Sequence, residues 1–269
     1  MSSMLAVAVT QFAPTMDANT NLQRFRDAAA TAAARGAKLL VGPEYASGFT
    51  AELGDWMGES AQTLDGAFVR ELAAIASEFE IAIVAGILVR ADDPAERRPY
   101  NVCIALSEQG ELVASYRKVH LYDAFGASET QWVLPGAPDQ APAVFDLGPF
   151  RIGVQTCYDL RFPEVSRRLV DAGANVLAIP AEWVAGPLKE AHWQTLLAAR
   201  AIENTSYVVA ADHPAPVGVG HSTILDPRGV ILASLGAERG DTVAWLSKTD
   251  LDAAREQNPA LRLRQYRIH

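Results

Sequence analysis

Apolar positions in the first third of the chain alternate between two periods. Residues 5–11, 38–42 and 81–89 form short apolar runs typical of buried strands, whereas residues 17–35 and 66–80 carry apolar side chains three or four positions apart. That spacing places the apolar side chains on one face of a helix. The pattern therefore predicts strands and helices in β–α–β order.

The middle of the chain differs, because apolar runs follow one another across turns without a helix between them. We expect hairpins here and a return of the strand and helix alternation afterwards. Sheets that carry helices on one face only must pack against each other, so the pattern predicts a four-layer α-β-β-α sandwich in a single α/β domain, residues 1–269. The later elements are expected as strands at 100–107, 111–120, 143–147, 150–156, 174–180, 207–212 and 241–246, helices at 163–172, 188–204 and near 251–257, and a hairpin turning at 226–229.

Composition and charge narrow the classes of partner. The 269 residues are 49% hydrophobic and 20% charged, as in an ordinary globular protein with an ample core. A net charge of −9 opposes a broad phosphate-binding surface, so no nucleic acid is expected. No apolar run approaches the roughly 20 residues that span a bilayer, and the first residues lack the basic region of a signal peptide. We therefore expect a cytoplasmic protein without a membrane partner.

The two cysteines have different surroundings. Cys103 and Cys157 give neither a disulfide framework nor a zinc spacing, and no histidine completes a metal spacing, so no metal is expected. No phosphate loop or Rossmann fingerprint is present either, so no cofactor is expected. Cys103 lies in an apolar strand and is assigned to the core. Cys157 lies where a strand meets a turn and a helix start, and backbone N–H groups at such a junction stabilise a thiolate or an oxyanion. The alternative is that Cys157 is one more small buried side chain.

Two other polar residues also end apolar runs. Glu44 follows a Gly-Pro pair and Lys118 closes a β-rich run, although singly they are also typical of a solvated loop acid and a surface cation. The order Pro-Glu at 43–44, Arg-Lys-Val-His-Leu at 117–121 and Cys-Tyr-Asp-Leu-Arg-Phe-Pro-Glu at 157–164 resembles the nitrilase superfamily of carbon–nitrogen hydrolases. The resemblance extends from residues 6–12 to residues 220–229.

Within that superfamily, residues 157–164, 192–193 and 200–204 are most similar to the omega-amidase and deaminated glutathione amidase branch. Residues 182–193 do not reproduce the Ala-Phe stretch of the eukaryotic members, which leaves the substrate open. The resemblance implies a triad of Glu44, Lys118 and Cys157, with Glu129 as a second glutamate beside the lysine. Cys157 would attack the carbonyl carbon, Glu44 would move protons, and Lys118 with the N–H of Tyr158 would stabilise the oxyanion.

Three side chains are candidates for substrate contacts besides Tyr158. Tyr45 and Trp183 follow strand ends at one rim and either line the acyl site or only pack there. Arg161 either binds a substrate carboxylate or forms a structural salt bridge with Asp159, Glu164 or another nearby acid.

The histidines offer a different mechanism. If the strand continued to residue 120, His120 would share the face of Lys118, and a protease-like pair of Cys157 and His120 is the alternative. His192 and His221 are expected to be structural.

The sequence therefore predicts an enzyme that hydrolyses a small linear amide through a cysteine thioester and releases ammonia. The substrate class expected is an omega-amide of a dicarboxylic acid or deaminated glutathione. An N-carbamoyl-amide or nitrile hydrolase with the same triad is the alternative, and a catalytically idle binding or assembly protein is the alternative from another class. The resemblance also implies a homodimer or higher homo-oligomer, with residues 259–269 as a tail that contacts the partner.

Overall fold

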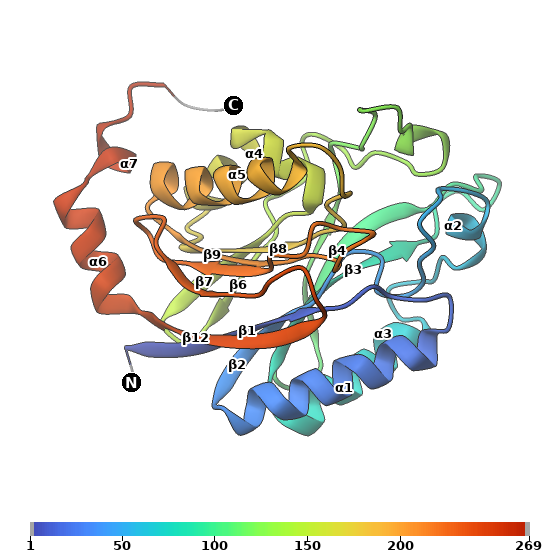
Figure 1. Cartoon of the computed structure of the whole chain (residues 1–269), viewed down its shortest axis with the longest axis horizontal. Coiled ribbons are helices and arrows are strands. Elements are labelled where there is room, and N and C mark those ends of the chain that lie inside the picture. The colour runs from blue at the N-terminus through green and yellow to red at the C-terminus, as the bar shows by residue number, and fades with distance from the viewer. Residues whose placement is uncertain (1–2, 267–269) are drawn as a thin grey trace.

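The computed structural model describes residues 3–266, and its strands form two six-stranded sheets (Figure 1). The strands are β1 (Met4–Gln11), β2 (Ala37–Val41), β3 (Ala82–Val89), β4 (Tyr100–Leu106), β5 (Leu112–Arg117), β6 (Val144–Leu147), β7 (Phe150–Val154), β8 (Val176–Pro180), β9 (Tyr207–Ala211), β10 (Thr223–Leu225), β11 (Ile231–Ser234) and β12 (Gly240–Ser247). The helices are α1 (Ala18–Ala34), α2 (Trp56–Glu59), α3 (Ala67–Phe79), α4 (Pro163–Asp171), α5 (Lys189–Asn204), α6 (Lys248–Gln257) and α7 (Ala260–Leu263), with single 3₁₀ turns η1 (Glu129–Gln131) and η2 (Cys157–Arg161).

The two sheets are built alike. The first has the order β12-β1-β2-β3-β4-β5 and the second the order β11-β10-β9-β8-β7-β6. In each sheet three neighbouring strands are parallel, β1 to β3 and β7 to β9, and each of the other strands pairs antiparallel with its neighbours. Parallel strands need helical crossovers, which explains the β–α–β order at the start and in the second half of the chain.

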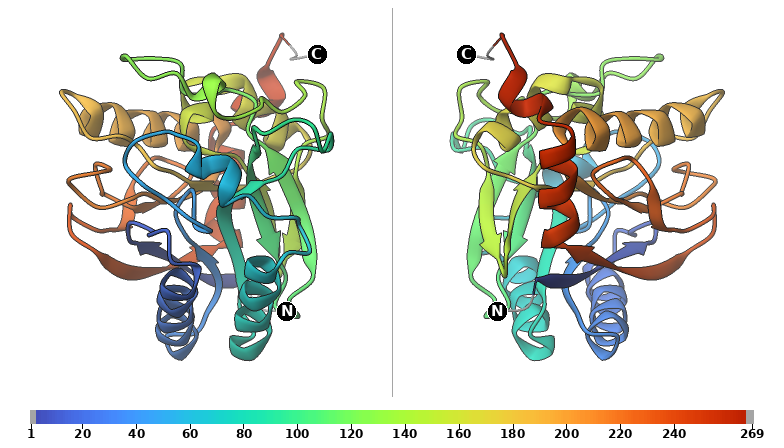
Figure 2. Two further views of the ribbon diagram at one scale, coloured as in Figure 1. Left: turned by 90° about the vertical axis from the view of Figure 1, so that its right-hand side faces the viewer. Right: turned by 90° about the vertical axis from the view of Figure 1, so that its left-hand side faces the viewer.

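The apolar core forms three layers between the four layers of secondary structure. Val7, Leu39 and Ile152 lie in the cluster between the sheets. Phe25 of α1 packs on the outer face of the first sheet and Trp193 of α5 on the outer face of the second. Figure 2 shows α1 and α3 side by side on one side of the sheets and α5 on the other. The predicted α-β-β-α sandwich is therefore confirmed.

The predicted boundaries differ from the structure at one place that matters for the site. The strand expected at 111–120 ends at Arg117, so Lys118 and His120 lie beyond it. The N–H of Lys118 donates to the carbonyl of Asn101 on β4 (2.8 Å), after which the chain turns away. The short elements α2, α7, η1 and η2 were not predicted, because each spans a single turn or little more.

The carboxyl-terminal segment extends past the sandwich as α6 and α7 (Figure 1). Arg264 forms an ion pair with Asp171 of α4 in the same chain. Residues 267–269 of the tail predicted to contact a partner lie outside the described residues, and the partner contact stays a prediction. None of the helices in residues 3–266 has the length and apolar character that a bilayer crossing requires.

Candidate active site

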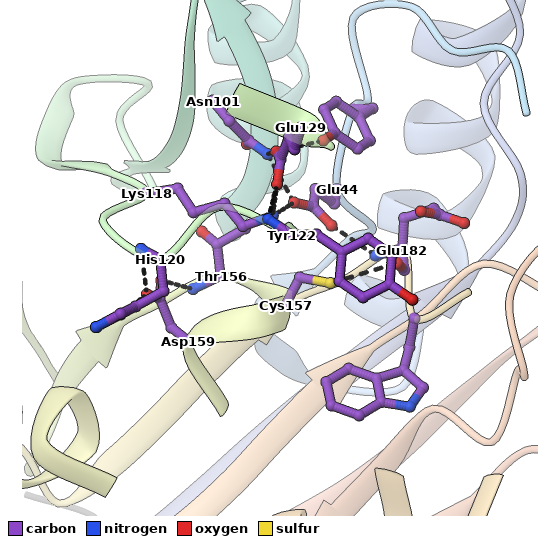
Figure 3. A network of polar contacts seen from close by, with 12 residues as sticks. Glu44, Asn101, Lys118, His120, Tyr122, Glu129, Thr156, Cys157, Asp159 and Glu182 are labelled. Atoms are coloured by element: carbon purple, nitrogen blue, oxygen red, sulfur yellow. Dashed lines mark hydrogen bonds and ion pairs between the residues drawn. The ribbon is translucent and has the colours of Figure 1, made fainter. Parts of the chain in front are cut away.

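The three residues of the predicted triad lie together, each just after a strand (Figure 3). Glu44 follows β2, Lys118 follows β5, and Cys157 begins η2 after β7. The side chains of Glu44 and Lys118 are each 1% exposed and Cys157 is 5% exposed. Three polar groups buried at one place need partners, because a buried charge without one is costly.

Lys118 lies between two carboxylates. Its Nζ atom is 3.0 Å from Oε1 of Glu44 and 2.9 Å from Oε2 of Glu129, and the Nδ2 atom of Asn101 donates to Oε1 of Glu44 (2.7 Å). Glu129 also accepts the hydroxyl of Tyr45 (2.7 Å) and the N–H of Tyr122 (2.6 Å). The implied second glutamate beside the lysine is thus in contact with it.

The charges in this cluster shift the pKa values of the two glutamates in opposite directions. Burial disfavours the ammonium of Lys118, but the carboxylates of Glu129 and Glu44 outweigh it and hold the pKa of Lys118 well above its ordinary value. Burial also opposes ionisation of Glu129, but Lys118 and the two donated hydrogen bonds lower its pKa. Burial, reinforced by the charge of Glu129, raises the pKa of Glu44 despite Lys118. Of the two glutamates, Glu44 is therefore the one that takes up a proton more readily.

The thiol of Cys157 depends on a base. Burial and the neighbouring Glu44 raise its pKa well above the ordinary value, so the resting group is a thiol. Its Sγ atom donates to the carbonyl oxygen of Glu182 (3.3 Å), and Cys157 and Glu44 line the same cavity. The N–H of Glu182 itself donates to Oε2 of Glu44 (2.7 Å). The backbone of Glu182 thus contacts both the nucleophile and the candidate base.

A cavity of about 170 Å³ opens beside these groups. A narrower pocket lies next to this cavity and shares Tyr122, Cys157, Glu182 and Val184 with it. Besides the triad, the cavity is lined by Tyr45, Phe49, Ala51, Leu53, Phe125, Ala127 and Glu129, and the narrow pocket by Tyr158, Arg161, Trp183 and Lys189. The four residues predicted to contact the substrate therefore line one of these two lobes, the cavity or the narrow pocket. Tyr45 lines the cavity, and Tyr158, Arg161 and Trp183 line the narrow pocket.

Arg161 does not form the structural salt bridge that was the alternative for it. None of the ion pairs within residues 3–266 includes Arg161, and Asp159 is paired with His120 instead. The guanidinium lies 4.8 Å from the ring centre of Trp183, and Nη2 is 3.3 Å from Nδ1 of His192. Its charge therefore faces the narrow pocket without an acidic partner.

His120 does not share the side of Lys118, because the strand ends before both residues. Its Nδ1 atom is 2.8 Å from Oδ1 of Asp159, and its ring stacks on Phe162 with centroids 3.7 Å apart. Figure 3 shows His120 turned away from the sulfur of Cys157. The structure thus contradicts the shared-face argument behind a Cys157 and His120 pair.

Four residues of the site were not predicted from the sequence. Asn101 reads as an ordinary position in an apolar strand, and Tyr122 belongs to a loop without periodicity. Lys189 begins α5 after Leu188, whose left-handed φ of 62° turns the chain. Glu182 follows β8 in the stretch that departs from the eukaryotic pattern. Residues 3–266 contain no cluster of three or more His, Cys, Asp or Glu side chains arranged for a metal ion.

Lys189 adds a second cation to the narrow pocket. Its Nζ atom donates to the hydroxyl of Tyr122 (2.6 Å) and lies 3.9 Å from the ring centre of Phe125. Burial and the like charge of Arg161 lower the pKa of Lys189. No ion pair within the described residues includes Lys189. Arg161 and Lys189 therefore place two positive charges along the narrow pocket, which Cys157 and Glu182 also line.

The fold and this arrangement of groups define a carbon–nitrogen hydrolase. The chain belongs to the carbon-nitrogen hydrolase family, whose model matches residues 6–258, and it is an enzyme of the amidase type.

Individual relatives are similar to this chain in sequence or structure along nearly its whole length. The sequence is 36% identical to the deaminated glutathione amidase of Escherichia coli O157:H7, over 97% of this chain and 98% of that one. The structure is similar to Saccharomyces cerevisiae Nit3, a nitrilase-superfamily member of branch 10, with a TM-score of 0.85, 27% identity and coverage of 99% and 98%. It is also similar to a mutant nitrilase-superfamily amidase of Nesterenkonia AN1, with a TM-score of 0.79, 30% identity and coverage of 96% and 95%.

Proposed function

We propose that this chain hydrolyses an amide whose acyl group carries a carboxylate, by means of a triad of Glu44, Lys118 and Cys157. The observation that carries the proposal is the position of Lys118 Nζ between Glu44 and Glu129, beside a thiol that is not ionised at rest. A fixed cation, a carboxylate of raised pKa and a nucleophile are the three groups that amide cleavage needs.

The reaction divides into two halves. Glu44 accepts the Sγ proton as Cys157 attacks the carbonyl carbon, and Lys118 with the N–H of Tyr158 stabilises the oxyanion. Glu44 then gives the proton to the departing nitrogen, and the thioester remains on Cys157. In the second half Glu44 takes a proton from water, which adds to the thioester carbon. Collapse of that intermediate releases the carboxylic acid and returns the proton to the sulfur.

The charges of the narrow pocket support an acyl group that carries a carboxylate. Arg161 and Lys189 place two positive charges beside Cys157, which fits a carboxylate at the far end of a dicarboxylic acyl chain. Deaminated glutathione, the compound named for the Escherichia coli relative, has such an acyl group, a five-carbon chain ending in a keto acid. Its leaving group is a dipeptide amine and not ammonia, and the 170 Å³ lobe has room for part of it.

The experiment compares glutaramate with pentanamide, an uncharged amide of equal chain length. We expect wild-type protein to prefer glutaramate, and Arg161→Met to raise the KM for glutaramate by about tenfold or more, the value of one charged hydrogen bond. Turnover of pentanamide should change little. Arg35→Met, an exposed arginine at the end of α1, is the matched control.

Four outcomes contradict parts of the proposal. If Arg161→Met lost activity equally on both amides, the proposed carboxylate pocket would be contradicted. Preferential turnover of nitriles or N-carbamoyl amines, measured in the same panel with ammonia and free-amine detection, would establish the alternative hydrolase. Full activity in Cys157→Ala would overturn the triad, and absence of selective alkylation at Cys157 would favour an idle binding protein.

A further inference from the structure

One peptide group connects the nucleophile to a buried carboxylate that lies outside the triad. The carbonyl of Glu182 accepts the thiol of Cys157 (3.3 Å), and the N–H of the same peptide belongs to Trp183. A trans peptide is planar, so its C=O and N–H point in opposite directions. On the far side, the N–H of Trp183 donates to Oδ1 of Asp212 at 2.6 Å. The orientation of the carbonyl that holds the thiol is thus fixed from behind by Asp212.

Asp212 is itself held firmly. It follows β9 and is 0% exposed. Its second oxygen, Oδ2, accepts the N–H groups of Val219 and Gly220, both at 3.1 Å. Hydrogen bonds from N–H groups to a carboxylate are shorter and stronger than those to a neutral acceptor. Asp212 therefore ties the segment after β8 to the loop before β10.

The same segment reaches the candidate base. The N–H of Glu182 donates to Oε2 of Glu44 (2.7 Å), and the N–H of Glu44 donates to the carbonyl of Ala181 (3.3 Å). A shift of the peptide between Glu182 and Trp183 would move the contacts of thiol and base together. Asp212 lines neither lobe of the cavity, so its effect must pass through this backbone.

We propose that Asp212 is a positioning residue of the reaction, which holds the Glu182–Trp183 peptide so that the Cys157 thiol faces Glu44. The proposal rests on the proposed triad. Asparagine at this position has the same shape but only one accepting oxygen. Its NH₂ group would face either the N–H of Trp183 or those of Val219 and Gly220. The hydrogen bonds on that side would therefore be lost.

The test is Asp212→Asn, assayed with glutaramate. We expect kcat to fall about tenfold or more with KM within twofold of wild type, because misplacing reacting groups by a fraction of an ångström slows the chemical step. Asp226→Asn is the matched control. Asp226 also accepts two backbone N–H groups, of Arg228 and Val230 at 2.8 Å, in the turn between β10 and β11. It should lose thermal stability and keep its kcat.

Two further variants keep the outcomes distinct. If Asp212→Asn does not accumulate as folded protein, Asp212→Gly, which leaves room for water to accept the N–H groups, is assayed with the same expectation. A folded Asp212 variant with kcat within twofold of wild type overturns the positioning role. If Cys157→Ala is inactive in that same assay, the triad survives while the role of Asp212 does not, and an active Cys157→Ala removes the triad first.

Discussion

At the scale of single residues, Lys118 keeps its charge balanced while a proton moves on and off Glu44. Glu129 stays ionised because Tyr45 and Tyr122 donate to it in addition to the lysine. When Glu44 takes the thiol proton, Lys118 therefore still has one carboxylate partner and remains a cation. A lone glutamate beside the lysine would lose this balance at the moment when the oxyanion forms.

Replacing Lys118 tests this arrangement against the histidine alternative. We expect Lys118→Met to lower kcat/KM by on the order of a hundredfold or more, as loss of a principal oxyanion donor does. His120→Asn should lose much less, because asparagine can still donate to Asp159. The measurement is kcat/KM of both variants across pH 5 to 9.

Lys118→Met also leaves two buried carboxylates unpaired, which destabilises a fold by several kcal/mol. The double variant Lys118→Met with Glu129→Gln removes one of those charges, and its thermal unfolding shows whether the protein is folded during the assay. A tolerated Lys118→Met beside an inactive His120→Asn would replace the proposed triad by the pair of Cys157 and His120.

At the scale of elements, Gly86 of β3 allows Glu44 to reach the site. A Cβ atom on Gly86 would lie 2.8 Å from the Cα atom of Glu44 and 3.3 Å from the N atom of Tyr45. Both are backbone atoms, which cannot rotate away. The glycine lets the segment after β2 pack directly on β3, where the N–H of Ala46 donates to the carbonyl of Gly86 (2.6 Å).

We expect Gly86→Ala to lower kcat by about tenfold or more, since it displaces the base by several tenths of an ångström. It should also cost about 1–3 kcal/mol of stability through overpacking. Gly236→Ala is the control, because a Cβ there meets nothing within 4 Å. Steady-state kinetics and urea unfolding of both variants separate the two effects, and an unchanged kcat in folded Gly86→Ala would contradict this role of the close packing.

The positions of the elements also explain which site residues the sequence could predict. Glu44, Lys118 and Cys157 each follow a predicted strand, so the strand pattern together with the family motif located them. Lys189 depends on the left-handed turn at Leu188, and Tyr122 on a loop, and neither feature has a periodic signal. Asp212 could not be identified from the sequence, because its partners are backbone N–H groups of Trp183, Val219 and Gly220, which only the fold brings together. Layers and parallel strands were predictable because burial on both faces leaves continuous apolar runs.

At the scale of the whole molecule, His213 joins the two sheets beside the site. It follows β9 in the second sheet, and its Nε2 atom donates to the carbonyl of Glu44 after β2 in the first sheet (2.8 Å). Its ring is 0% exposed and meets Phe49 edge to face with centroids 4.6 Å apart, while Nδ1 is buried and has no hydrogen-bond partner among residues 3–266. Burial disfavours the imidazolium and lowers the pKa of His213 to about 4.

This histidine makes stability depend on pH in a defined window. The unfolded chain binds a proton at His213 below about pH 6.5, whereas the folded chain does so only near pH 4, so stability falls as the pH drops between these values. The expected loss is about 3 kcal/mol by pH 4. His213→Gln can still donate to Glu44 but binds no proton. Urea unfolding of both proteins from pH 7 to pH 4 measures their free energies of unfolding. The free energy of unfolding should therefore fall less with pH for the variant than for wild type. Parallel curves for the two proteins would mean that His213 has the same pKa in the folded and the unfolded chain, which would contradict the effect of burial.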